Sequence, residues 1–391
     1  MNNLKGVQSI GIKLPIIRQG DDLVKIVSDA VIDAMTTYVD GIPNGFDNKV
    51  YDIQDNDVIG ITESIVARSQ GNYVTIDEIV YYMAHHMEFG GAQISKNLVL
   101  YSPIMSRNRF SMILKAFARY ADSITIIYEG KYDEQGNPNE GVNPFTGVDI
   151  KEYYRELCES ENCKFEMHMN QMDYHYQRPQ YYLLGEKWMG VEFGETFIDC
   201  RCHPEKGDQL TLKDFMKSPI LFSGWNNEYG LLGSNKATEE KIKLFPVPIE
   251  AQKLVEDIQK EIFDRIGKHV EVMVYGDGCF KDPVGGIWEW ADPVVSPAYT
   301  KGLEGTPNEI KIKAFADDKF KDLNGQELTD AIKSEIKNKD ANLVGNMASQ
   351  GTTPRRYVDL LGSLMDLTSG SGDKGTPVVL VKNYFNNFAK D

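Results

Sequence analysis

Apolar residues are spaced along this chain in two ways, one typical of amphipathic helices and the other typical of short buried strands. Residues 23–34, 249–266 and 326–336 carry an apolar side chain every three or four positions, which predicts a helix over each range. Asp21 or Asp22 is the expected cap of the first helix. Unbroken apolar runs predict buried strands at residues 57–61, 97–101, 124–128, 270–275 and 377–381.

The stretch 97–128 follows the order strand, loop, helix and strand, which favours neighbouring parallel strands. Its loop contains Arg107 and Arg109 just before the predicted helix. Backbone N–H groups at a helix start favour an anion. Two interpretations stay open, an anion-binding loop or a pair of ordinary surface arginines.

Length and charge limit the classes of protein that fit this chain. Its 391 residues are enough for about two or three domains, or for one domain with a large insertion. The 42 Lys and Arg against 58 Asp and Glu give a net charge of −16, which argues against nonspecific nucleic-acid binding. No apolar stretch approaches the roughly 20 residues of a membrane span, and the N-terminal residues lack the pattern of an export signal. We therefore expect a soluble, cytoplasmic protein with neither a nucleic-acid nor a membrane partner.

One strand end is a candidate for ligand chemistry. The apolar run from Val270 to Tyr275 stops at Gly276-Asp277-Gly278. A buried strand fixes the position of the aspartate, and the flanking glycines let a ligand approach the backbone. A carboxylate in this setting suits a metal ion or the sugar or phosphate of a nucleotide. The alternative is an aspartate that only caps a turn.

Five short segments, in order along the chain, resemble motifs of the coenzyme F-420:L-glutamate ligase family, the γ-glutamyl ligases. Each lies at a predicted strand end or helix start, and they are residues 14–23, 57–71, 229–235, 276–280 and 375–381. The first contains GDDL, the second reads DVIGITESIVARSQG where the family has a KIVSKAEG-type segment, and the third reads GLLGSN where it has AGVDxSN. The resemblance implies an α+β protein with a γ-glutamyl-ligase-like fold.

The resemblance covers roughly residues 14–93 and 221–381 and leaves out the segment between them. It therefore implies a ligase-like core built from residues 1–96 and 221–391, with an inserted α/β segment at residues 97–220. It also implies a homodimer.

The family's chemistry implies a nucleotide- and metal-dependent ligase. The enzyme would join an amino acid, glutamate in the first place, to an acidic small-molecule acceptor through an amide bond. GTP or ATP would be the co-substrate, and Mg²⁺ or Mn²⁺ the metal. The resemblance implies that Asp277 is a catalytic metal ligand and that Arg68 is a catalytic contact to a phosphate. It implies that Gly20, Asp21 and Asp22 lie along the nucleotide, and that Ser234 and Asn235 orient the metal or the phosphates. Arg107 and Arg109 would bind an anionic part of the acceptor.

Some positions depart from the family pattern. Leu232 replaces the metal-binding aspartate of VDxSN and cannot bind a hard cation. Glu228 would supply the missing carboxylate from a changed loop, or is an ordinary surface residue. Gly278 replaces a threonine, and Ser64 replaces the first lysine of KIVSK.

These departures favour an alternative function, a non-catalytic small-molecule or nucleotide-binding protein that kept the fold and lost the metal chemistry. A third hypothesis assigns a separate transferase activity to the inserted segment.

Overall fold

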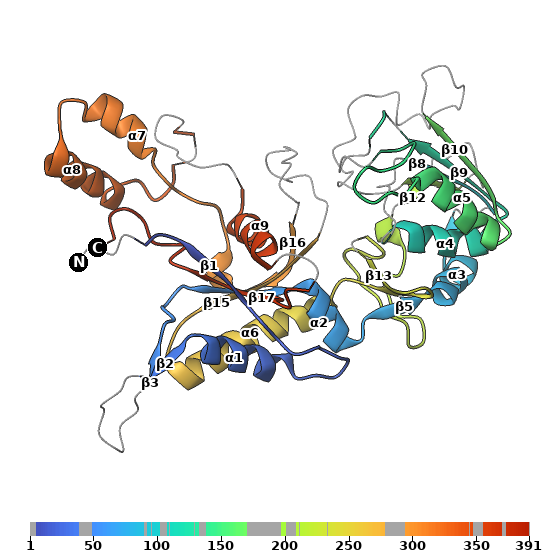
Figure 1. Ribbon diagram of the computed structural model, residues 1–391, viewed down its shortest axis with the longest axis horizontal. Helices are drawn as coiled ribbons and strands as arrows, with labels where there is room; N and C mark the ends of the chain where they lie inside the picture. Colours follow the sequence, from blue (N-terminus) through green and yellow to red (C-terminus); the bar gives the residue numbers. More distant parts are fainter. Residues whose placement is uncertain are drawn as a thin grey trace.

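The computed structural model describes residues 5–38, 49–89, 92–94, 96–101, 108, 110–128, 130–132, 138–169, 197–200, 209–210, 212–232, 234–277, 294–343, 345–346, 355–369 and 373–390. A central unit built on one sheet carries a second unit built on another sheet and a small helical unit, as Figure 1 shows. Helices and several separate sheets are both present, and the expected α+β class is confirmed.

The central sheet has the strand order β1-β17-β4-β15-β16. Its strands are β1 (Gln8–Ile12), β17 (Val378–Lys382), β4 (Val58–Thr62), β15 (Glu271–Asp277) and β16 (Val294–Tyr299). The strands β4 and β15 run parallel, whereas the other neighbouring pairs are antiparallel. Two segments that are far apart in sequence therefore end at the same edge of the sheet.

Helices cover both faces of this sheet (Figure 1). The helices α1 (Leu23–Ala34) and α6 (Pro248–Ile266) share one apolar cluster with Val378 and Leu380 of β17. The helix α9 (Tyr357–Ser369) shares another with Val379 and Val381. Successive strand residues point to opposite faces of the sheet. Because helices cover both faces, both sets of side chains are buried. This explains the unbroken apolar run of β17.

The ends of the helices follow from local sequence. The Asp22 carboxylate accepts the backbone N–H of Lys25 at 3.1 Å, so Asp22 is the cap of α1. The helix α2 (Glu63–Gln70) ends at Gly71, whose φ of 69° is easily reached by a residue without a Cβ. Pro248 starts α6 at a position where its missing N–H is not needed.

The second unit is built on a sheet with the order β10-β9-β8-β11-β12. Its strands are β8 (Asn97–Tyr101), β9 (Ser123–Tyr128), β10 (Lys164–Met169), β11 (Phe197–Cys200) and β12 (Gln209–Leu210). The strands β8, β9 and β10 are parallel, as the order of elements predicted for the first two. Its helices are α3 (Ile76–His85), α4 (Phe110–Tyr120) and α5 (Ile150–Ser160).

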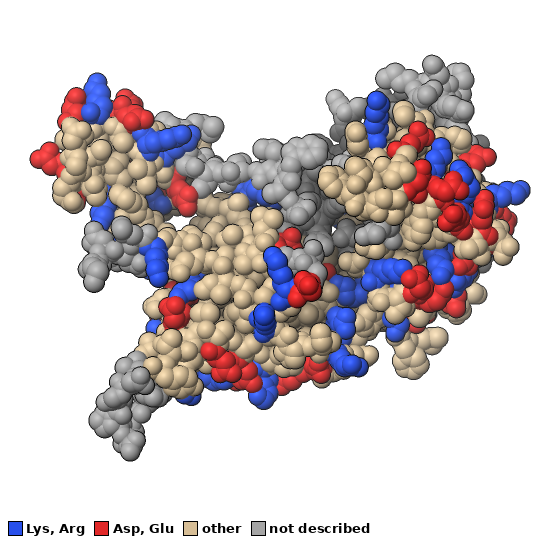
Figure 2. Space-filling view, viewed as in Figure 1, with Lys and Arg blue, Asp and Glu red and all other residues tan. Residues whose placement is uncertain are grey.

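The apolar core of this second unit draws on residues from 74 to 245. It includes Ile76 and Ile79 of α3 and, from the other side of the predicted insertion, Leu232 and Phe245. Figure 2 shows acidic and basic side chains gathered over this unit and along the lower edge of the central unit, over α1 and α6. The core of the second unit thus extends beyond residues 97–220 on both sides.

The two units are joined by a three-stranded sheet of β13 (Asn235–Thr238), β14 (Lys241–Lys243) and β5 (Tyr73–Thr75). The strand β5 follows α2 closely, and β14 leads into α6, so the outgoing and returning chains lie side by side. The Asn72 side chain ties the junction together, because its amide donates to the carbonyls of Phe245 and Trp225 at 2.6 and 3.0 Å.

The small helical unit contains α7 (Ile312–Ala314), a π-helical turn at Phe315–Lys319 and α8 (Gly325–Lys337). The remaining short strands are β2 (Thr36–Tyr38), β3 (Lys49–Tyr51), β6 (Glu88–Phe89) and β7 (Ala92–Gln93). Across the described ranges, none of the helices has the length and apolar character that a membrane crossing requires.

Candidate functional site

The candidate site lies at the edge where the parallel strands β4 and β15 end. Tyr275 is the register partner of Thr62, so Glu63, which follows β4, and Gly276-Asp277, which end β15, lie at the same edge of the sheet. In sheets with parallel strands, ligands commonly bind outside the carboxyl ends of the strands. This edge also faces the junction with the second unit, because α2 begins here and leads into β5.

A buried ion pair joins the two units at this edge. The Lys243 ammonium donates to both carboxylate oxygens of Glu63, at 2.8 and 2.7 Å, and each side chain is only 7% exposed. Lys243 comes from β14 and Glu63 from the first turn of α2. Each charge is neutralised by the other, which is the condition under which charged side chains are retained in an interior.

Gly276 makes room for this ion pair. A Cβ at position 276 would lie 2.0 Å from Cγ of Glu63 and 2.9 Å from its Cβ. These distances are far below van der Waals contact, so any side chain here would displace Glu63. The first glycine of Gly276-Asp277-Gly278 is therefore needed for the packing of Glu63.

The two residues predicted to orient a metal or phosphates lie beside the ion pair. Asn235 is the register partner of Lys243 in the β13–β14 hairpin, and Ser234 directly precedes it. Ser234 is fully buried, and its hydroxyl has no hydrogen-bond partner among the residues that the structure describes. A buried hydroxyl without a partner is unfavourable by about 1–3 kcal/mol, which makes Ser234 a candidate for a ligand contact.

The Gly20-Asp21-Asp22 loop lies at the opposite end of α2. The Gly20 N–H donates to the Ser69 carbonyl at 2.8 Å, and Arg68 Nε donates to the Ile17 carbonyl at 3.2 Å. The Asp21 carboxylate accepts the N–H of Arg18 at 2.7 Å. The structure thus brings the first motif segment to the C-terminal end of α2, and α2, with eight residues and about 12 Å of length, separates this loop from the Glu63 edge.

The structure does not place the side chains of the other predicted site residues in this polar cluster. Glu228 is exposed, and its backbone N–H donates to Asn226 Oδ1 at 2.9 Å. Leu232 is buried in the apolar core of the second unit. Only the backbone of Asp277 is described, at the last position of β15, and Arg107, Arg109 and Gly278 lie outside the described residues. Their site roles stay predictions.

Glu63 and Lys243 are the site residues that sequence reasoning missed. Glu63 directly follows Thr62, the last residue of β4, and Lys243 stands between Ile242 and Leu244. For Lys243, a single charge bordered by apolar residues is a signal that was present in the sequence. It becomes informative only when both charges are seen to meet.

The oxygen chemistry of this edge suits a hard cation. Mg²⁺ prefers carboxylate, amide and hydroxyl oxygens. The Ser234 hydroxyl, without a partner among the described residues, offers such an oxygen, whereas the Asn235 amide oxygen accepts the Lys236 N–H at 3.0 Å; Asp277 ends the strand β15 at the same edge. Within the described side chains, no group of three or more His, Cys, Asp or Glu residues is arranged to hold a metal.

The fold and this edge define a protein that combines an α+β core with a polar cluster at the ends of two parallel strands. The family model described as F420-0:Gamma-glutamyl ligase matches residues 11–383. The chain belongs to the F420-0:gamma-glutamyl ligase family, and the resemblance seen in the short motifs is confirmed. No curated protein matches the chain.

Proposed function

We propose that this protein is a nucleotide- and metal-dependent γ-glutamyl ligase. It joins an amino acid, with glutamate as the first candidate, to an acidic small-molecule acceptor, and it uses GTP or ATP as the co-substrate. The observation that carries this proposal is the buried polar cluster of Glu63, Lys243 and Ser234 at the carboxyl edge of β4 and β15, in a chain of the ligase family.

The reaction needs positive charge near the nucleotide. A bound Mg²⁺ or Mn²⁺ would neutralise the phosphates and the charge that develops on them. Asp277, Ser234 and Asn235 are the residues that would hold it. Arg68 is exposed on α2, and among the described residues it contacts only the Ile17 carbonyl, through Nε, so its terminal N–H groups are available there to bind a phosphate.

The remaining task is to hold the reacting groups in line and to keep water away. Orientation alone contributes several kcal/mol to reactions that join two substrates. The Glu63–Lys243 pair fills the edge with two mutually neutralised groups that are almost fully shielded from solvent. A shielded edge strengthens electrostatic contacts to a bound substrate.

Calorimetric titration tests this function. GTP and then ATP are titrated into the wild-type protein with and without Mg²⁺ or Mn²⁺, and Asp277→Asn is compared with Asp264→Asn, an exposed site on α6. We expect metal-dependent binding that weakens at least tenfold in Asp277→Asn and is unchanged in the control. Glutamate and acidic acceptors are then screened for an amide product by mass spectrometry. Metal binding and product formation that survive in Asp277→Asn would sink this mechanism.

A non-catalytic binding protein is the second candidate. It is favoured by Leu232, which is buried in an apolar core and occupies the position of a metal-binding aspartate in the family pattern. Such a protein would bind a nucleotide or small molecule equally well with and without metal. It would also form no product with any combination of glutamate and acceptor.

A further inference from the structure

The β13–β14 hairpin is held at both of its ends by charged side chains from outside the hairpin. At its base, Lys243 meets Glu63 of the central unit. At its turn, Glu239 and Glu240 meet Lys115 of α4 in the second unit. Ser234 and Asn235, the candidate ligand contacts, begin the strand that pairs with Lys243. The position of these two residues therefore depends on how both ends are fixed.

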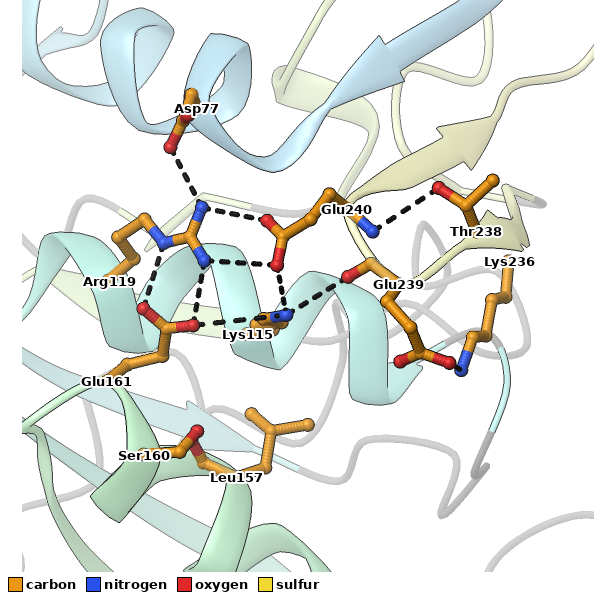
Figure 3. Close-up of polar contacts among 10 residues, drawn as sticks. All are labelled: Asp77, Lys115, Arg119, Leu157, Ser160, Glu161, Lys236, Thr238, Glu239 and Glu240. Carbon is orange, nitrogen blue, oxygen red and sulfur yellow. Dashed lines mark hydrogen bonds and ion pairs between the residues drawn. The ribbon is translucent and has the colours of Figure 1, made fainter.

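The cluster at the turn is centred on Arg119. Figure 3 shows its guanidinium between three carboxylates, with Nε and Nη2 donating to Glu161 at 2.8 Å each and Nη1 donating to Asp77 at 2.8 Å and Glu240 at 2.9 Å. Lys115 also donates to the Glu239 carbonyl at 3.0 Å. One arginine thus connects α3, α4, the residue after α5 and the hairpin turn. The planar guanidinium suits such a multiple contact.

The pair at the base fixes the hairpin against the central sheet. The strand β14 also pairs with β5, so Lys243 cannot shift without moving the hairpin. An isolated buried charge is strongly unfavourable, and the pair therefore selects the one arrangement in which both groups meet. That arrangement places the hairpin base beside Gly276, which packs on Glu63.

We infer that the hairpin is an arm through which the second unit holds Ser234 and Asn235 against the carboxyl end of β15. Glu63 and Lys243 are positioning residues for this site. Arg119 is a positioning residue at the other end, because it binds the hairpin turn to the helices of the second unit. The inference rests on the proposed function only where a nucleotide is named as the ligand. The second unit is thus part of the ligand-binding apparatus.

Hydrogen exchange of the full-length protein without ligand tests the arm directly. The double variant Glu63→Gln/Lys243→Met removes both buried charges together, which avoids an unpaired one. We expect the amides of residues 234–243 to exchange at least tenfold faster in this variant and in Arg119→Met. The matched controls are Lys241→Met, an exposed lysine on the same strand, and Arg155→Met, a partly exposed arginine on α5. Exchange within twofold of the wild type in both test variants overturns the inference.

Titration of Mg²⁺–GTP then separates positioning from stability. We expect the double variant to bind at least tenfold more weakly, while its melting temperature stays close to that of the wild type. Lys243→Arg keeps the positive charge and should restore affinity to within about threefold. Unchanged affinity in a double variant with a loosened hairpin contradicts the positioning role. Absence of GTP binding in the wild type would refute the proposed nucleotide dependence, and hydrogen exchange would still decide whether the arm exists.

Discussion

The two ends of the β13–β14 hairpin are both held by ion pairs, but their surroundings differ. At the base, Glu63 and Lys243 are each 7% exposed, and the Lys243 ammonium donates to both carboxylate oxygens of Glu63. At the turn, Arg119 is 26% exposed and shares its donors among carboxylates that range from 15% exposed for Glu161 to 82% for Asp77. The comparison teaches that ion pairs of the same kind contribute differently to the stability of the fold, according to how much water reaches them.

The physical reason is the opposition of solvation and Coulomb attraction. Water screens the pairs at the turn, so loss of one partner leaves a charge that solvent can stabilise, and exposed pairs contribute about 0–1 kcal/mol each. At the base, loss of one partner leaves a buried charge that water does not reach and therefore does not stabilise. Removal of single charges from the two ends should therefore have very different effects.

Removal of Lys243 should have the largest effect. Lys243→Met removes the cation that neutralises the buried Glu63 carboxylate, and the free energy of unfolding should fall by about 3–5 kcal/mol in urea denaturation. Lys241→Met on the same strand should change it by no more than about 0.5 kcal/mol. The prediction would be wrong if the two variants were equally stable. It would also be wrong if adding Glu63→Gln to Lys243→Met restored none of the lost free energy of unfolding.

A methyl group at position 276 should have an intermediate effect. Gly276→Ala places a Cβ against Cγ of Glu63 and should lower the free energy of unfolding by about 1–3 kcal/mol through overpacking. In a Glu63→Ala background the obstructing atom is gone, so the same change should have less than half of that effect. Gly6→Ala, where a Cβ would meet nothing within 4 Å, is the control. Equal effects in both backgrounds would show that Glu63 does not occupy this space.

The smallest effect should come from the exposed turn and should depend on pH. Hydrogen bonds from Arg119 and then Lys115 lower the pKa of Glu240 below its usual value of 4.5. Because the folded pKa is lower than the unfolded one, the stabilisation is present above the unfolded pKa and is lost as the pH falls through the folded pKa.

Glu240→Gln should therefore be about 0.5 kcal/mol less stable than the wild type at pH 7, and this difference should vanish in thermal melts recorded well below pH 4.5. Glu159→Gln, an exposed site on α5, should show no such trend. A difference that persists at low pH would mean that Glu240 acts through packing rather than charge.

Five of the strands and three of the helices in the described residues were predictable from local sequence. The apolar runs gave β4, β8, β9, β15 and β17 within a residue or two, and the periodic stretches gave α1, α6 and α8. Helix and strand periods follow from backbone geometry, which each segment carries within itself. The order of elements in residues 97–128 also predicted that β8 and β9 are parallel, because short connections through a helix favour that arrangement.

The candidate site was predictable only in part. The motif segments pointed to Gly276-Asp277, Ser234 and Asn235, and the structure places these residues at the same junction. Glu63 and Lys243 are 180 residues apart, and no local pattern connects them. Strand alternation would even assign Lys243 to the same exposed face as Lys241. Lys243 is buried because the central unit packs over the end of the strand.

The sequence by itself determined the elements of this protein, the cap at Asp22 and its membership of a ligase family, because all of these depend on short runs of residues. Only the tertiary structure decided that Glu63 and Lys243 neutralise each other beside Gly276, and that the second unit supports one side of the site. The reason is that a charge between apolar residues has no defined partner until two distant segments meet and exclude water from both.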